Sequence, residues 1–162
     1  MPWHDGLKIA ASVLFLASLL GLSLIDLQIQ RLPDKIVLPM LALGLANNLG
    51  SLITTPTDAL LGAALGYGSL WTLGTLYALR RGAAFGRGDL KLAAMMGAWL
   101  GASALPLILF VAFAAGTLVT VPLVLVGLCR FDQRVPFGPA LALGGATALL
   151  APLTGLHLTP FL

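Results

Sequence analysis

Two aspartates stand at the ends of apolar segments, where a charged side chain is costly. Asp26 closes the apolar run that begins near Leu7. Asp89 opens another run within the stretch FGRGDLKLAAMMGAWLG, residues 85–101. An ionisable group within a transmembrane segment is a functional hypothesis by default, because the bilayer disfavours charge. These two residues are therefore the first candidates for chemistry in this chain.

A close pair of carboxyl groups can hydrolyse a peptide bond without a metal or a cofactor. Two such groups cannot both ionise easily, so the pKa of one rises and the pair shares a proton near neutral pH. The ionised member then takes a proton from water, and the protonated member donates to the carbonyl oxygen of the peptide. We therefore predict that Asp26 and Asp89 form the dyad of an aspartic protease.

The remaining residues offer no competing catalytic set. The sequence has no G-x-S-x-G and no H-E-x-x-H motif. Its single cysteine, Cys129, excludes an internal disulfide, and its two histidines lie near opposite ends of the chain without ligand spacing. No metal or cofactor is therefore expected. Gly86 and Gly88 would allow an extended peptide to approach the backbone closely beside Asp89, and Lys91 adds a positive charge there.

Each acidic residue also has a structural interpretation, which the sequence leaves open. Asp89 would make an ordinary N-cap for the apolar helix that follows it. Asp26 could form an ion pair with a cation of the next loop, either Arg31 or Lys35. Asp34, in the tripeptide LPD, is typical of a turn or a helix cap.

The composition is that of a polytopic, all-α membrane protein. The chain has 162 residues, of which 59% are hydrophobic and 9% are charged, whereas a soluble domain carries about 25% charged residues. The formal net charge is +3. In a membrane protein, Lys and Arg serve first to set the orientation of the helices. We therefore expect membrane lipid, and not nucleic acid, as the surrounding partner.

Apolar runs separated by polar or Gly/Pro-rich breaks predict about six transmembrane helices in a single domain, 1–162. The predicted ranges are 7–27, 37–54, 58–79, 89–103, 105–128 and 137–157. The first is long enough to cross a core of about 30 Å and is interpreted as a retained helix. The fourth is short, which suggests that Asp89 begins below the membrane surface. Gly62–Gly66 and Gly97–Gly101 are small-xxx-small patterns that bring helices together.

The basic residues predict the topology. Eight of the nine Lys and Arg residues fall in the first, third and fifth loops or at their edges, namely Arg31, Lys35, Arg80, Arg81, Arg87, Lys91, Arg130 and Arg134. By the positive-inside rule these loops are cytoplasmic, and both termini face the other side. Asp26 and Asp89 then lie at one membrane depth, near the cytoplasmic face.

Three segments resemble those of a known family. GRGDLKLAAMMGAWLG resembles the G-x-G-D-x-K-L signature of type IV prepilin peptidases, which belong to the GxGD intramembrane aspartyl proteases. LIDLQIQRLPDKIVLPMLALGL is similar to an earlier segment of that family, and RVPFGPALALGG to one near its C-terminal end. All three occur in the expected order, so the resemblance covers nearly the whole chain.

The resemblance implies that Asp26 and Asp89 are catalytic and that Gly86, Gly88 and Lys91 complete the motif. It implies removal of a short, often basic leader from type IV prepilins, or from pseudopilins of type II secretion. The cut lies before the apolar N-terminal helix of the substrate, at the cytoplasmic face of the bacterial inner membrane. Many members carry an N-terminal domain with paired C-x-x-C motifs and also N-methylate their product. This chain resembles the short form, for which we expect no zinc site and do not favour methyltransferase activity.

A further expectation concerns the residues that would contact a basic leader. The predicted cytoplasmic face is net positive, so Asp34 or Asp132 would have to guide a basic leader by local contact. Asp132 also has a simpler interpretation, as a loop ion pair with Arg130 and Arg134.

A proton-linked transporter is the main alternative function, although transport sites lie near the bilayer midplane between repeats. An inactive assembly factor for a pilus or secretion system is the other.

Overall fold

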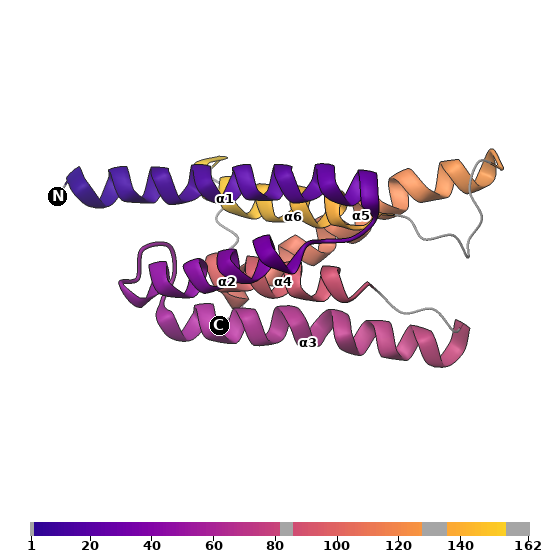
Figure 1. Ribbon diagram of the computed structural model, residues 1–162, viewed down its shortest axis with the longest axis horizontal. Coiled ribbons are helices and arrows are strands. Elements are labelled where there is room, and N and C mark those ends of the chain that lie inside the picture. The colour runs from indigo at the N-terminus through magenta and orange to yellow at the C-terminus, as the bar shows by residue number, and fades with distance from the viewer. Residues whose placement is uncertain (1, 82–85, 128–135, 155–162) are drawn as a thin grey trace.

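The protein is a bundle of helices that run side by side. The computed structural model describes residues 2–81, 86–127 and 136–154, and every regular element in these ranges is a helix. The α-helices run along the long axis of the molecule and alternate in direction (Figure 1). In chain order the elements are α1 (Pro2–Ile29), α2 (Asp34–Leu49), α3 (Pro56–Arg81), α4 (Arg87–Leu100), η1 (Ala102–Ala104), α5 (Leu105–Leu125), α6 (Gly138–Leu150) and η2 (Ala151–Thr154).

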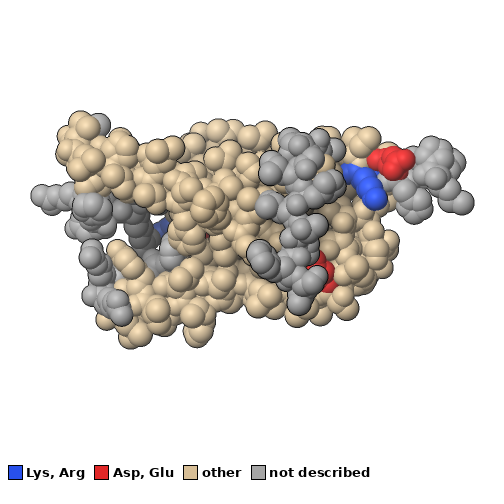
Figure 2. Space-filling model, turned by 180° about the vertical axis from the view of Figure 1, so that it is seen from behind, with Lys and Arg blue, Asp and Glu red and all other residues tan. Residues whose placement is uncertain are grey.

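Among the residues that the structure describes, three helical segments are long and apolar enough to cross a membrane. They are Asp5–Ile29, Pro56–Leu79 and Ala102–Leu125. The other α-helices are shorter, as expected for the one that carries Asp89. With 14 residues, α4 is about 21 Å long, well below a hydrocarbon core of about 30 Å. The surface agrees with lipid contact, since the described residues on the face in Figure 2 include very few charged side chains.

The predicted second helix, 37–54, is wrong at both ends. Pro33 is extended and precedes the helix, which begins at Asp34. An acidic residue in the first turn suits the positive end of the helix dipole. The helix ends at Leu49 because the side chain of Asn48 bends the chain that follows. Its Oδ1 accepts hydrogen bonds from the backbone N–H groups of Ile53 and Thr54, both at 3.1 Å.

Helix α4 forms the centre of the bundle. It packs chiefly against α3 and α2, and also against α6, and every residue from Leu92 to Leu100 is buried. Trp99 is fully buried, stacks on Phe15 with ring centroids 5.1 Å apart, and donates from Nε1 to the carbonyl of Met40 at 2.7 Å. Asp89 therefore lies at the start of a helix whose later turns pack against neighbouring helices on several sides.

Glycines allow α3 and α4 to touch through their backbones. A Cβ added at Gly62 would overlap the Gly97 carbonyl, and one added at Gly66 would overlap the Ala93 carbonyl. The prediction that the small-xxx-small patterns join helices is confirmed for Gly62, Gly66 and Gly97. This contact sets the register of α3 against α4 and hence the height of Asp89 in the bundle.

Candidate functional site

Asp26 lies near the C-terminal end of α1, with its carboxylate against the beginning of α6. The side chain is only 5% exposed, and its Oδ2 accepts a hydrogen bond from the backbone N–H of Gly138 at 2.9 Å. The first N–H groups of a helix have no partner within the helix and carry partial positive charge. The structure thus pairs Asp26 with the backbone of α6 and not with the loop cations that its structural interpretation proposed.

Glycine at position 138 makes this contact possible. A Cβ there would lie 2.6 Å from Oδ2 of Asp26, 2.9 Å from its Cγ and 3.0 Å from its Cβ. Any side chain would therefore displace the carboxylate or the helix. The sequence had indicated only that the segment RVPFGP begins a helix, so Gly138 is a residue of the site that the sequence analysis missed.

Asp89 lies in the first turn of α4 and is half-buried. The N-cap of this helix is Gly86, which makes no side-chain cap bond, and the N–H of Asp89 donates to the Gly86 carbonyl at 3.0 Å. The interpretation of Asp89 as an N-cap is therefore wrong. From the third position of the helix, its carboxylate instead interacts with the backbone of Gly86, the N-cap residue.

The structure brings the two aspartates together. The negative charge of Asp26 acts on the Asp89 carboxylate, so the two groups lie within electrostatic range of each other. The C-terminal end of α1 and the N-terminal end of α4 lie at the same end of the bundle (Figure 1). Like charges at short range disfavour simultaneous ionisation. Two carboxyl groups in this arrangement can therefore influence each other's ionisation.

The two motif glycines are in close contact with their surroundings. A Cβ at Gly86 would lie 3.0 Å from Oδ2 of Asp89, and a Cβ at Gly88 would lie 2.9 Å from Cβ of Leu32. Leu32 is a buried residue of the segment between α1 and α2. These contacts give a steric reason for glycine at both positions, in addition to the predicted close approach of a peptide substrate.

Lys91 and Asp34 form an ion pair beside the two aspartates. Nζ of Lys91 donates to both carboxylate oxygens of Asp34, at 2.7 and 2.6 Å. The Lys91 side chain is 29% exposed and the Asp34 side chain 55%. Asp34 is the first residue of α2. Its carboxylate therefore already has a cationic partner, Lys91, on α4. Asp132, the other residue expected to guide a leader, lies outside the described residues.

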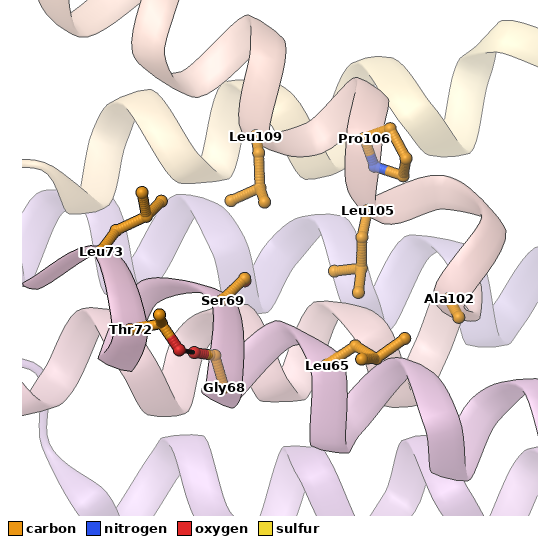
Figure 3. A pocket seen from close by; sticks show the side chains of 9 residues that line it. All are labelled: Leu65, Gly68, Ser69, Thr72, Leu73, Ala102, Leu105, Pro106 and Leu109. Atoms are coloured by element: carbon orange, nitrogen blue, oxygen red, sulfur yellow. Dashed lines mark hydrogen bonds between the residues drawn. The ribbon is translucent and has the colours of Figure 1, made fainter. Parts of the chain in front are cut away.

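A separate hollow of about 650 Å³ lies between α3 and α5 and does not contain the aspartates (Figure 3). Its lining is mostly apolar, and its two hydroxyl side chains, Ser69 and Thr72, donate to carbonyls of their own helix, those of Gly66 and Gly68. No titratable side chain is among the described residues that line it, so the hollow offers no group for acid–base chemistry.

Comparisons with known proteins place this site in context. The model of the type IV leader peptidase family matches residues 13–121, a range that includes both aspartates. A prepilin leader peptidase/N-methyltransferase of Burkholderia pseudomallei is 45% identical over 134 residues, which are 82% of this chain and 43% of the relative. The proteins of that name in Pseudomonas aeruginosa and Aeromonas hydrophila are 42% and 39% identical, over 93% and 100% of this chain and 53% and 57% of theirs.

The chain thus spans about half the length of the curated relatives it matches. No solved structure matches it significantly.

Proposed function

The chain belongs to the type IV leader peptidase family, and from this premise we propose that it is an intramembrane aspartic endopeptidase. In this proposal it removes the short leader from type IV prepilins or pseudopilins. The observation that carries the proposal is that Asp26, at the end of α1, and Asp89, at the beginning of α4, are near enough for their charges to interact.

Water is the nucleophile in this mechanism. The ionised carboxyl group of the pair takes a proton from a water molecule, which attacks the carbonyl carbon of the scissile peptide bond. The protonated carboxyl group donates to the carbonyl oxygen as negative charge develops on it. The C–N bond of the resulting intermediate then breaks, and the carboxyl group that took the proton from water gives it to the departing amine. The bond from the Gly138 N–H to Asp26 holds one of the two carboxylates in a fixed place, so little reorganisation is needed when the substrate arrives.

The distribution of charge supports a site near the cytoplasmic face of the inner membrane. Arg31, Lys35, Arg87 and Lys91 all lie at the ends of the helices that carry or adjoin the two aspartates. By the positive-inside rule that end of the bundle is cytoplasmic. In the proposed topology the alternating α-helices make six spans, and the beginning of α1 and the end of α6 lie on the other side of the membrane (Figure 1).

The substrate class follows from this placement. A prepilin or pseudopilin offers an apolar N-terminal helix that lies in the bilayer and a leader that stays in water. Its scissile bond would then sit at the membrane surface, at the depth of the two aspartates. A transporter would instead carry its titrating residues near the midplane, whereas Asp26 lies in the last turn of α1 and Asp89 in the first turn of α4.

Cleavage of a purified prepilin with a basic leader, in lipid at neutral pH, tests the proposal. Wild type is compared with Asp26→Asn and Asp89→Asn, and Asp5→Asn near the N-terminus serves as the matched control. We expect wild type and the control to cleave and both dyad variants, still folded, to be inactive. Cleavage that survives either dyad substitution would refute the paired mechanism. Failure of wild type on all pilin-like substrates would refute the peptidase.

A further inference from the structure

Two contacts join the beginning of α2 to the first turns of α4. One is the ion pair between Asp34 and Lys91, in which both carboxylate oxygens accept from the same ammonium group, at 2.7 and 2.6 Å. The other is the close approach of Leu32 to Gly88, where an added Cβ would lie 2.9 Å from Cβ of Leu32. We call these four residues the α2–α4 clamp.

The clamp connects the two segments that carry the aspartates. On one side, Leu32 and Asp34 follow shortly after Asp26 along the chain. On the other, Gly88 and Lys91 flank Asp89 on α4. Helix α1 packs chiefly on α6, whereas α4 packs chiefly on α3 and α2. The two aspartates thus belong to helices with different main neighbours, and the clamp is a direct connection between their ends.

We infer that the α2–α4 clamp positions Asp89 relative to Asp26, so that Asp34 and Lys91 are positioning residues of the proposed peptidase. The inference rests on the proposed function, because a dyad works only when both carboxyl groups reach the same water and carbonyl. A displacement of about 1 Å at a reacting centre can cost about a hundredfold in rate. An exposed ion pair contributes little to stability, so its loss should leave the bundle folded.

This role differs from two simpler ones for the same residues. If Asp34 binds the basic leader, its loss weakens substrate binding and leaves the chemical step unchanged. If Lys91 acts through its own charge on Asp89, the position of its partner is irrelevant. Positioning by the pair instead requires opposite charges at positions 34 and 91, whichever residue carries which sign.

A charge exchange separates these roles. Cleavage of a basic-leader prepilin is measured for Asp34→Asn, Lys91→Gln and the double variant Asp34→Lys/Lys91→Asp, with Lys35→Gln as control for a changed charge on the same turn. We expect each single variant to lower kcat by about tenfold or more with little change in KM, and the exchange to restore most of it. The control should cleave like wild type.

Three kinetic results would overturn the inference. The first is cleavage at the wild-type rate by the single variants Asp34→Asn and Lys91→Gln. The second is an Asp34→Asn variant that raises KM alone, which would make Asp34 a leader contact. The third is an exchanged pair that stays as slow as Lys91→Gln. Failure of wild type to cleave any prepilin counts against the proposed function instead, and a measurement without substrate then decides on the clamp.

That second measurement is the distance between α1 and α4. Spin labels are placed at the exposed positions Gln28 and Arg87, after the single cysteine, Cys129, has been replaced by Ser. We expect one narrow distance distribution in the wild-type background, a broader or shifted one with Asp34→Asn, and recovery in the exchanged pair. A distribution that stays the same in all three backgrounds would refute positioning, whatever the enzyme cleaves.

Discussion

Substitution of Gly138 by alanine is the most direct perturbation of the candidate site that leaves both aspartates in place. The added Cβ would lie 2.6 Å from Oδ2 of Asp26, whereas ordinary van der Waals contact begins at 3.4 Å. The carboxylate or the beginning of α6 must therefore move by about 0.8 Å, because a packed interior has little free space to absorb the overlap. The hydrogen bond from the Gly138 N–H, 2.9 Å long, is strained by the same movement.

A misplacement of this size should appear in the rate of the chemical step. Displacements of about 1 Å cost up to about a hundredfold in rate, which corresponds to about 2.7 kcal/mol of activation free energy. We expect Gly138→Ala to lower kcat for prepilin cleavage by one to two orders of magnitude, roughly. In the proposed function the apolar helix of the substrate lies in the bilayer, away from Gly138, so KM should change little.

The assay is cleavage of a saturating prepilin in lipid, with thermal unfolding recorded on the same preparations. Gly21→Ala is the matched control, because it lies on the same helix as Asp26 and nothing lies within 4 Å of the added Cβ. It should keep full activity and gain stability, by up to about 1 kcal/mol. A folded Gly138→Ala protein that cleaves at the wild-type rate would refute the placement of Asp26 against α6. Equal losses in both variants would show that the effect is not local to the dyad.

Three further substitutions test the packing that supports the site, each by thermal unfolding in lipid. Asn48→Ala removes a buried side chain that makes four hydrogen bonds and should cost about 3 kcal/mol; an unchanged unfolding midpoint would contradict its role in ending α2. Gly97→Ala should lower the midpoint strongly by overlap with the facing helix, whereas Gly68→Ala, with nothing within 4 Å, should not; similar midpoints would disprove the backbone contact. Trp99→Phe replaces the indole by a smaller phenyl ring, so it loses the bond to the Met40 carbonyl and leaves a void at a fully buried position, for an expected cost of about 2 kcal/mol or more; a stabilised variant would contradict this packing.

Several features of the fold could be predicted from the sequence because they depend on neighbours along the chain. Hydrophobic runs identified each helix, since a segment without polar groups favours a helix in lipid. Breaks rich in Gly, Pro and charge located most of the ends. Gly62 and Gly97 were correctly expected to bring helices together, because only small residues let two backbones meet. The shortness of α4 was also expected from the predicted range 89–103, although the helix runs from Arg87 to Leu100.

The contacts of the candidate site could not be predicted in the same way. Asp89 fitted the pattern of an N-cap, but the helix begins earlier, at Arg87. Asp26 had cations within a few residues, yet its carboxylate lies against Gly138, at the other end of the sequence. The partner of Lys91 proved to be Asp34, on another helix.

The physical reason is that these contacts depend on how each helix is rotated and at what height it packs. In a soluble helix, the alternation of polar and apolar residues shows which face is buried. In a membrane both the lipid-facing and the buried face are apolar, so this signal is weak. The sequence alone therefore determined that the chain forms apolar helices and which acids stand at their ends. Only the packed bundle, with glycines setting the registers of its helices, decided that Asp26 lies against Gly138 and within electrostatic range of Asp89.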